Sequence, residues 1–306
     1  MCFIFRGLKH GRGLEFISRL FLYYSFSLSL WRKHFFPFFM QTIKYQGLKI
    51  SLKNYQKVND FLVVEAPLQI NINNESYTVV MRTPNDDIEL IRGLLFAEDI
   101  YKKTSPLVFK IIKEESKITS IINITISKDD LGKGYLNKRT LLSVSSCGIC
   151  GKQELKDLKV TGERLESTFF SSENLFKMQL EMTAFQETFK KSGGSHAAAI
   201  FDKNQELLTI KEDLGRHNAV DKTVGDLLHK NNLKKANFLV VSGRVSYEIV
   251  SKAFIAKIPI IIAVSACSSL AVDFAKEFGI CLIGFTRDQK MTIYSNPNYL
   301  NNLENV

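Results

Sequence analysis

The sequence predicts an α/β protein with two domains, and three observations lead to this prediction. The chain has 306 residues, which exceeds the usual size of a single domain. Between about residues 41 and 134, apolar and polar residues alternate in short runs, as they do in half-buried strands. From residue 196 onward, continuous apolar runs are separated by helical patterns, which is typical of a parallel or mixed sheet covered on both faces. We expect four segments: an extension over residues 1–40, an N-terminal α+β domain over 41–140, a mobile CxxC loop over 141–165 and an α/β domain over 166–306.

The first 40 residues differ in composition from the rest of the chain. They hold six cations and one acid, and so carry half of the formal net charge of +10. Their longest charge-free run, over residues 20–31, is shorter than the roughly 20 residues that a membrane-spanning helix needs. No small-residue cleavage site follows this run, so it does not match a secretory signal peptide. We favour the interpretation that Met40 is the biological start over the alternative of an anchor at a membrane surface.

Within the N-terminal domain we expect a hairpin, a helix and a further strand. Apolar residues alternate with polar ones over residues 68–72 and again over 77–81, with a turn between the two runs. The next residues have the composition of a helix start, with Thr83 as the N-cap and Pro84 at the first helical position. Isoleucines between residues 118 and 126 mark another strand.

The second domain begins with a predicted amphipathic helix. Apolar positions recur every three or four residues from Leu175 to Phe189, and Gly193 ends the pattern. We assign this stripe of Met and Phe to the core. Buried strands are expected over residues 197–201, 238–241, 259–264 and 280–285, and helices near 219–229, 246–257 and 270–278. In such sheets ligands bind beyond the carboxyl ends of the strands.

Polar residues gather at these predicted strand ends. Small-residue turns at Gly243 and Ser265 offer backbone N–H groups at helix starts, where phosphate binds, although most such turns only cap their helices. Arg216, Arg244 and Arg287 can each add a bidentate contact to a phosphate. Three arginines and several Ser/Gly turns at one edge of a sheet predict a polyanionic or nucleotide-like ligand.

The composition excludes several classes of function. Beyond residue 40 the chain is only mildly basic and has no basic stripe with interleaved aromatic residues, so we expect no nucleic-acid partner. Five cysteines, an odd number, do not predict a disulfide framework. Two positions after His196 stands Ala198 rather than the glutamate of the zinc deaminases, so deaminase chemistry is excluded.

Cys147 and Cys150 form a CxxC motif inside a loop rich in Gly and Ser. Cations on both sides of the motif favour the thiolate form. The motif alone is compatible with half of a zinc site, with a thioredoxin-like dithiol and with a sulfur-handling loop. A zinc site needs a second pair of ligands, which Cys2, Cys267 and Cys281 do not supply by their spacing. A thioredoxin-like dithiol opens a helix in a βαβ unit, and that context is missing from this stretch.

Taken together, these segments resemble the FdhD family of formate dehydrogenase accessory sulfurtransferases. The resemblance is carried, in the family's order, by residues 65–67, 81–84, 145–152, 193–196, 212–222, 242–248, 265–272 and 284–287. Residues 1–39 have no counterpart. Asp99 stands where glycine is expected, and Cys267 where proline is usual. The resemblance implies a cytidine-deaminase-like three-layer α/β domain, a smaller N-terminal α+β domain and a homodimer.

The resemblance also implies a cytoplasmic sulfur carrier without a bound metal or a membrane span. Such a protein accepts persulfide sulfur from a cysteine desulfurase. It passes the sulfur to the molybdenum or tungsten of a bis(molybdopterin guanine dinucleotide) cofactor (bis-MGD), which then enters formate dehydrogenase. Cys147 would be the persulfide carrier and Cys150 its helper or a second carrier.

The site residues for the cofactor come from two sources. The resemblance implies a cofactor-binding stretch made of Phe285, Thr286, Arg287, Asp288, Gln289 and Lys290. As candidates for phosphate and guanine contacts we add Arg216, His217, Gly243, Arg244 and Ser265. Two alternatives stay open: a non-catalytic chaperone for the molybdenum cofactor that uses its cysteines structurally, and a dithiol oxidoreductase with a reversible Cys147–Cys150 disulfide.

Overall fold

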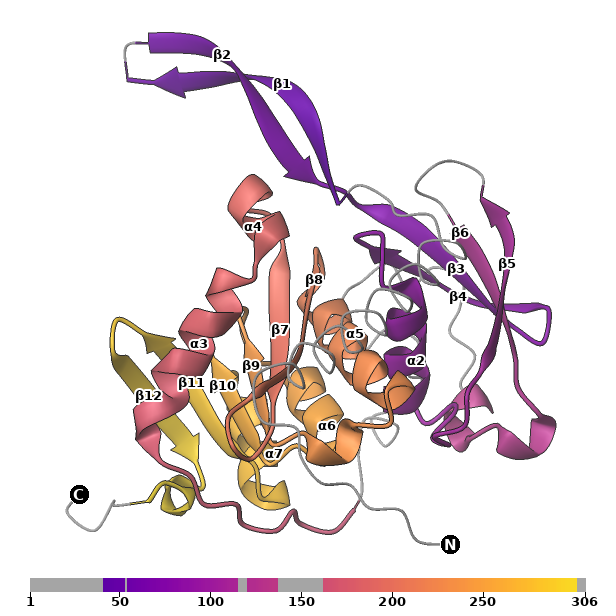
Figure 1. Cartoon of the computed structure of the whole chain (residues 1–306), viewed down its shortest axis with the longest axis vertical. Coiled ribbons are helices and arrows are strands. Elements are labelled where there is room, and N and C mark those ends of the chain that lie inside the picture. Colours follow the sequence, from indigo (N-terminus) through magenta and orange to yellow (C-terminus); the bar gives the residue numbers. More distant parts are fainter. Residues whose placement is uncertain (1–40, 53, 115–119, 137–161, 302–306) are drawn as a thin grey trace, which may run out of the picture. The chain divides into compact units, whose positions relative to one another are not determined.

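The computed structural model describes residues 41–52, 54–114, 120–136 and 162–301 (Figure 1). The extension, Cys147 and Cys150 lie outside this described part. All of the described residues belong to one compact unit. The described strands form a sheet of two strands, a sheet of four and a sheet of six.

The four-stranded sheet has the order β4-β3-β6-β5. β3 (Ala66–Ile72) and β4 (Glu75–Arg82) form the predicted hairpin, while β5 (Val108–Glu114) is antiparallel to β6 (Ser120–Thr125), which lies parallel to β3. In the hairpin turn Asn73 and Asn74 adopt φ values of 53° and 69°, a left-handed conformation that asparagine tolerates. Helix α2 (Asp87–Ala97) shares a core with this sheet, formed mainly by leucines and isoleucines.

The predicted helix start at Thr83 and Pro84 is wrong, because α2 begins only at Asp87. Thr83 is fully buried. Its N–H donates to the carboxylate of Asp213 (3.1 Å), and its hydroxyl oxygen accepts from the N–H of Leu214 (3.0 Å). Contacts with the six-stranded sheet therefore use the polar atoms that a helix N-cap would have used.

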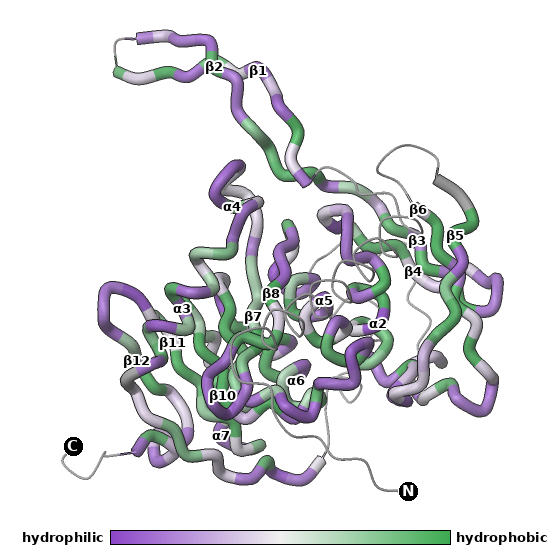
Figure 2. Tube along the Cα trace, viewed as in Figure 1, coloured by the Kyte–Doolittle hydropathy of each residue, from purple (hydrophilic) through white to green (hydrophobic). Residues whose placement is uncertain are grey.

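The six-stranded sheet has the order β12-β11-β10-β9-β7-β8. Three central strands are parallel, namely β9 (Phe238–Val241), β10 (Ile260–Ala263) and β11 (Cys281–Arg287). β7 (His196–Phe201) runs antiparallel to β9, β8 (Leu207–Asp213) is antiparallel to β7, and β12 (Lys290–Ser295) is antiparallel to β11. The prediction of a mixed sheet is confirmed, and Figure 2 shows the hydrophobic character of its central strands.

Helices cover both faces of this sheet. On one face Ala198 and Ile200 of β7 join a core with α5 (Arg216–His229), α6 (Tyr247–Ile255) and α7 (Ser269–Phe278). On the other face Ala197 and Ala199 pack with residues of α3 (Leu175–Ala184). Successive strand residues point to opposite faces, so the continuous apolar runs in the sequence correspond to strands buried on both sides. The cytidine-deaminase-like arrangement that the resemblance implies stays a prediction.

The predicted helix over residues 175–189 is two helices. α3 ends at Ala184, and α4 (Glu187–Ser192) follows after a break at Phe185 and Gln186. Leu175, Met178 and Met182 are core residues as predicted, but Phe185 and Phe189 are about half exposed. The apolar residues keep their helical spacing through the break, but the chain does not continue as one helix. The apolar residues after the break therefore lie outside the core.

Five strands were not predicted. β1 (Thr42–Ser51) and β2 (Asn54–Val63) form the two-stranded antiparallel sheet, and most of their side chains are exposed. The other three are outer strands: β5 of the four-stranded sheet, and β8 and β12 of the six-stranded sheet. All five carry charged residues and have few neighbours on at least one side, so they lack the continuous apolar runs that identify central strands.

A buried polar network joins the two large sheets. Lys222 and Asp213, both fully buried, form an ion pair of 2.7 Å. The Lys222 ammonium also donates to the carbonyl of Thr83 (2.8 Å), and Asn218 bridges Asp213 and the carbonyl of Met81. Two of the motifs that carry the family resemblance, residues 81–84 and 212–222, therefore meet at this junction.

Helices α2 and α5 cross at two glycines of the same junction. A Cβ added to Gly225 would lie 1.8 Å from the carbonyl oxygen of Glu89, and one added to Gly93 would lie 2.0 Å from that of Asp221. The backbones approach so closely that no side chain fits at either position. Short 3-10 helices complete the described part: Lys128–Asp130, Lys133–Leu136, Ser172–Asn174, Leu233–Lys235 and Pro297–Tyr299. Of the helices described, none has the length and apolar character needed to cross a membrane.

Candidate ligand site at the edge of the six-stranded sheet

Strand directions bring several predicted residues to one edge of the six-stranded sheet. The parallel strands β9 and β10 end there, at the loops that hold Gly243 and Ser265. Because β7 is antiparallel to β9, its first residue, His196, lies at the same edge. β8 ends there too, and α5 begins just after it with Arg216 and His217. The pairing of the strands therefore assembles this site from distant segments of the chain.

Gly243 lies against two charged or polar side chains of this edge. A Cβ at position 243 would lie 3.2 Å from Nδ1 of His196 and 3.4 Å from Cβ of Arg216. The glycine therefore lets the loop after β9 approach both residues closely. The next residue, Arg244, is exposed and has no hydrogen-bond or ion-pair partner among the described residues.

The loops after β9 and β10 are held together by backbone hydrogen bonds. The N–H of Val245 donates to the carbonyl of Ala266 (3.0 Å), and the N–H of Ser268 donates to the carbonyl of Val245 (2.9 Å). The N–H of Phe285 donates to the carbonyl of Ser265 (3.0 Å), which joins β11 to the same assembly. These bonds make the edge a defined surface rather than a set of independent turns.

Several buried polar atoms at this edge have no hydrogen-bond partner among the described residues. They are Nε of Arg216, both ring nitrogens of His217, Oγ of Ser246, Oε2 of Glu248 and Oγ1 of Thr286. Buried polar groups are nearly always hydrogen-bonded in folded proteins, because leaving one unpaired costs about 1–3 kcal/mol. A cluster of such atoms beside two arginines is therefore the feature expected of a site that binds a polar, anionic ligand.

The charges at the edge keep both histidines neutral. Burial and the positive charges of Lys252 and Arg216, with a contribution from His196, lower the pKa of His217 to about 2. The pKa of His196 is lowered as well, by burial and then by Arg216 and Arg244. Positive charges that disfavour a proton on a histidine favour a bound anion for the same reason.

A chain of buried charges lies beside His217, and the sequence analysis did not select its members. Lys252 of α6 pairs with Asp221 of α5 at 2.5 Å and with Glu248 at 3.3 Å. Oε2 of Glu248 is 3.1 Å from Nδ1 of His217, although the pair lacks the angles of a hydrogen bond. Burial raises the pKa of Asp221 to about 6, against the lowering effect of Lys252. The spacing of Glu248 and Lys252, four residues apart on a mostly apolar helix, is the signal that could have identified them.

The stretch implied by the resemblance is only partly at this edge. Thr286 is fully buried and Phe285 is 39% exposed. Asp288 and Gln289 form the two-residue turn between β11 and β12, with φ values of 51° and 56°. Their neighbours Arg287 and Lys290 pair across this hairpin, and all four are exposed.

β11 is two strands away from β9, a distance of about 10 Å. The predicted residues therefore form two groups. Arg216, His217, Gly243 and Arg244 lie around β7 and β9, whereas Ser265 and residues 285–290 lie around β10 and β11.

Two described cysteines have no sign of reactivity. Burial raises the pKa of Cys267 to about 11 and that of Cys281 to about 12, so both remain thiols at neutral pH. Sγ of Cys267 lies 3.0 Å from the position of a Cβ on Gly284. Within the described residues, His, Cys, Asp and Glu side chains form no group of three or more suited to a metal ion.

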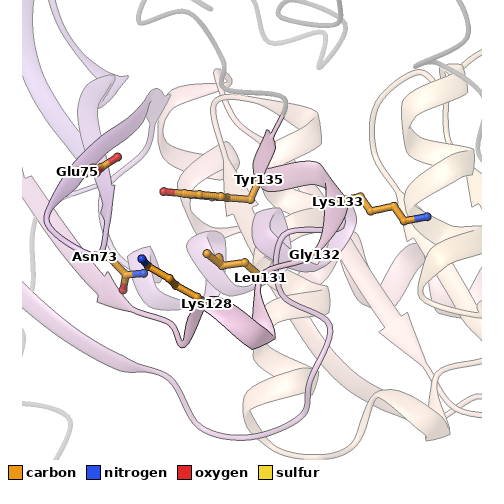
Figure 3. Close-up of a pocket in the computed structure, with 7 residues that line it drawn as sticks. All are labelled: Asn73, Glu75, Lys128, Leu131, Gly132, Lys133 and Tyr135. Atoms are coloured by element: carbon orange, nitrogen blue, oxygen red, sulfur yellow. The ribbon is translucent and has the colours of Figure 1, made fainter.

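The hollow shown in Figure 3 is separate from this edge. It has a volume of about 420 Å³ and is lined by Asn73, Glu75, Lys128, Leu131, Gly132, Lys133 and Tyr135. The ring of Tyr135 stacks on Tyr77, with 6.0 Å between ring centres. None of the predicted site residues lines it, and the amide of Asn73 is already bonded to Ile126. Chemistry therefore favours the sheet edge over the hollow as the ligand site.

Comparisons with curated proteins find close relatives of the chain. A protein from Saccharolobus solfataricus is 40% identical over 243 residues, which cover 78% of this chain and 90% of the relative. One from Picrophilus torridus is 38% identical over 247 residues, covering 78% and 92%. One from Sulfurisphaera tokodaii is 36% identical over 266 residues, covering 84% and 98%. Each of the three is named sulfur carrier protein FdhD.

A solved structure and a family model agree with these relatives. The structure, of a candidate formate dehydrogenase accessory protein from Desulfotalea psychrophila, superposes with a TM-score of 0.68 at 21% identity, and the match covers 85% of this chain and 100% of that one. At this identity the likeness shows the fold alone. The model of the FdhD/NarQ family matches residues 63–301, more than three quarters of the sequence. The chain therefore belongs to the FdhD/NarQ family.

Proposed function

We propose that this protein is a cytoplasmic sulfurtransferase that carries sulfur as a persulfide on Cys147. Its donor is a cysteine desulfurase, and its acceptor is the molybdenum or tungsten of bis-MGD before the cofactor enters formate dehydrogenase. Relatives that share 36–40% of the sequence are named sulfur carrier proteins, which supports the sulfur-carrying part. The observation that carries the cofactor part is the cluster of unpartnered buried polar atoms of Arg216, His217 and Ser246 at a cationic sheet edge.

The edge supplies what the nucleotide ends of bis-MGD require. Arg216 and Arg244 would bind phosphate oxygens, and the turns at Gly243 and Ser265 would let the ligand approach the backbone closely. Thr286 and Phe285 would hold a second part of the ligand at the end of β11. Bis-MGD carries a guanine nucleotide on each of its two pterins and so needs two nucleotide sites. The two groups of residues on one edge would supply two sites in one chain, and a homodimer would supply one equivalent site in each subunit.

The sulfur chemistry needs both cysteines of the CxxC motif. The Cys147 thiolate attacks the outer sulfur of the desulfurase persulfide, and the cysteine of the desulfurase leaves as a thiolate. Cys150 then attacks the inner sulfur of the Cys147 persulfide and releases hydrosulfide. Formation of the disulfide between Cys147 and Cys150 oxidises the two cysteines and so supplies the two electrons that reduce the carried sulfur to sulfide. Hydrosulfide and a proton replace an oxo ligand of the cofactor metal, and the oxygen leaves as water.

Sulfur loading tests this function directly. The purified chain is incubated with desulfurase and radiolabelled cysteine and run on a non-reducing gel. Cys147→Ser should accept no label, because a serine hydroxyl is not ionised at neutral pH and forms no persulfide. Cys267→Ser is the matched control and should retain the label, since burial keeps that thiol protonated.

Two outcomes would contradict the proposal. Label at the wild-type level on Cys147→Ser would transfer the carrier role to Cys150. Label on the Cys147→Ser, Cys150→Ser double variant would exclude the motif as the carrier.

A further inference from the structure

His217 is a buried side chain whose ring nitrogens form no hydrogen bond with the described residues. It lies in the first turn of α5 and is 3% exposed. Neither ring nitrogen has a hydrogen-bond partner among the described residues. Because an unpaired buried polar group is costly, these atoms are expected to meet a ligand.

The environment of the ring favours its neutral form. Burial, followed by the positive charges of Lys252 and Arg216, lowers the pKa of His217 to about 2. A neutral imidazole has one N–H and one bare nitrogen, and a neighbouring group decides which nitrogen carries the hydrogen. The ligand chemistry that His217 can recognise depends on that choice.

Glu248 is the neighbouring group that decides which ring nitrogen of His217 carries the hydrogen. Its Oε2 lies 3.1 Å from Nδ1 of His217, and its Oε1 is held by the ammonium of Lys252 at 3.3 Å. Lys252 is itself fixed by Asp221 on the same helix as His217. A carboxylate has only acceptors, so it attracts an N–H at Nδ1 and repels a bare Nδ1, even where the angle is not that of a hydrogen bond.

We propose that Glu248 positions His217 in the tautomer with hydrogen on Nδ1, so that Nε2 accepts a hydrogen bond from an N–H or O–H group of the ligand. This inference rests on the proposed function, because it assigns a part of the cofactor to His217. Glu248 is a positioning residue that acts through the ring, and Lys252 fixes the carboxylate in place.

This assignment separates the parts of the ligand. The phosphodiester and diphosphate-diester groups of the cofactor have no hydrogen to donate at neutral pH, so a bare Nε2 cannot bind them. Guanine offers donors at N1 and at its amino group, and ribose offers hydroxyl groups. His217 therefore recognises the nucleoside, while Arg216 and Arg244 hold the phosphates.

The tautomer can be measured in the intact protein. In the full chain with ¹⁵N-labelled histidine, NMR at neutral pH should show Nδ1 protonated and Nε2 bare for His217. In Glu248→Gln the amide can donate to Nδ1, so the Nε2-protonated form should appear. Glu187→Gln, which removes an exposed carboxylate on α4, is the control and should leave the His217 signals unchanged. A wild-type protein with hydrogen on Nε2 would overturn the proposal.

Ligand specificity gives a second, independent measurement. Calorimetry compares GDP, IDP and pyrophosphate on the wild type, His217→Phe and His217→Gln. We expect His217→Phe to weaken GDP binding roughly fivefold, the loss of one hydrogen bond, with unchanged pyrophosphate binding. His217→Gln keeps an acceptor oxygen and should recover part of the affinity. IDP lacks the amino group, so weaker wild-type binding of IDP identifies that group as the donor, and equal binding identifies N1–H or a ribose hydroxyl.

The possible failures can be told apart. Equal GDP affinity in the wild type and His217→Phe would overturn the role of His217 and leave the nucleotide site standing. A wild type that binds neither GDP nor pyrophosphate would overturn both this inference and the cofactor part of the proposed function. Sulfur loading on Cys147 would still report separately on the carrier.

Discussion

Residues 212–222 contribute both to the junction between the two large sheets and to the edge of the six-stranded sheet. The buried polar groups of these eleven residues differ in their pairing between the two regions. At the junction, Asp213 and Lys222 pair with each other and with the backbone around Thr83. At the edge, Arg216 and His217 retain buried nitrogens that have no hydrogen-bond partner in the part of the chain that the structure describes. Only a few positions along one motif separate a group that stabilises the fold from one that we propose binds a ligand.

This difference gives a criterion for deciding which residues of a motif stabilise the fold and which are available to a ligand. Burial alone does not separate the two sets, since His217 and Lys222 are both almost fully buried. The number of satisfied hydrogen bonds does separate them. Complete pairing of buried polar groups favours folding stability, whereas ligand binding requires polar groups that are unpaired in the free protein. Changes at the junction should therefore reduce stability, and changes at the edge should reduce binding.

The largest stability effect is expected at the junction. Lys222→Met leaves the fully buried carboxylate of Asp213 without its counter-ion and the carbonyl of Thr83 without its donor. We expect the free energy of unfolding to fall by about 3–5 kcal/mol, measured by urea denaturation. Lys230→Met is the control, because its ion pair with Asp226 has a half-exposed lysine and should contribute at most about 1 kcal/mol. Equal effects of the two substitutions would contradict the structural role of the junction.

Substitution at the edge of the six-stranded sheet should reduce ligand affinity and leave the free energy of unfolding nearly unchanged. Arg244→Ala removes an exposed cation that pairs with no described residue, so the free energy of unfolding should change by less than about 0.5 kcal/mol. The affinity for GDP should fall by about 1.5–3 kcal/mol, the contribution of a hydrogen bond to a charged group. Titration calorimetry measures the loss. Lys203→Ala removes one charge at the other end of β7 and should not affect binding. Unchanged GDP affinity in Arg244→Ala would place the phosphate site elsewhere.

The stability of the protein in mild acid should depend on His217. Its pKa is about 2 in the folded protein and 6.5 in an unfolded chain. As pH falls below 6.5, the unfolded state binds a proton that the folded state does not, so folding stability decreases. At pH 5.5 this amounts to about 1.4 kcal/mol.

Urea denaturation at pH 7.5 and pH 5.5 can isolate this contribution. In His217→Gln, the loss of stability between the two pH values should be smaller by that amount. Asp221, with its raised pKa, acts in the opposite direction in both proteins and cancels in the comparison. An identical pH dependence in both proteins would mean that His217 is protonated in the folded state.

The sequence alone predicts those features of the two regions that depend on local patterns. The central strands and the convergence of Gly243, Ser265 and Arg216 at one edge follow from apolar runs and strand direction. The division of residues 212–222 does not, because pairing depends on where residues 81–84 lie in space. The spacing of Glu248 and Lys252 could have marked them as a pair, but their contacts with His217 and Asp221 depend on tertiary packing.

The break between α3 and α4 shows the same limit. Tertiary contacts end the first helix while the apolar period continues. Glu212 binds the free N–H groups of Thr188 and Phe189 in the first turn of α4, at 2.8 and 2.9 Å. A residue more than twenty positions away thus stabilises the start of the second helix, and no local pattern contains that information.

The smallest expected effect concerns Asp99, where the sequence departs from the glycine expected in the family. Asp99 follows α2 in the left-handed conformation, at φ 58°. The N–H of Ile100 donates to the carbonyl of Leu95 (2.9 Å) and the N–H of Asp99 to that of Phe96 (3.3 Å), which is the Schellman pattern that favours glycine at this position. The aspartate also forms an exposed ion pair with Lys102 at 2.7 Å, which contributes little.

Asp99→Gly should therefore raise the free energy of unfolding, by less than about 1 kcal/mol. Asp99→Ala is the matched control, because it removes the same ion pair but keeps the Cβ that disfavours a positive φ. The difference between the two variants isolates the backbone contribution, and urea denaturation of both can resolve it. A glycine variant no more stable than the alanine variant would show that the left-handed turn carries no strain. Because the turn lies outside the sheet edge, GDP affinity should stay at the wild-type value in both variants, as expected for a region whose polar groups serve the fold alone.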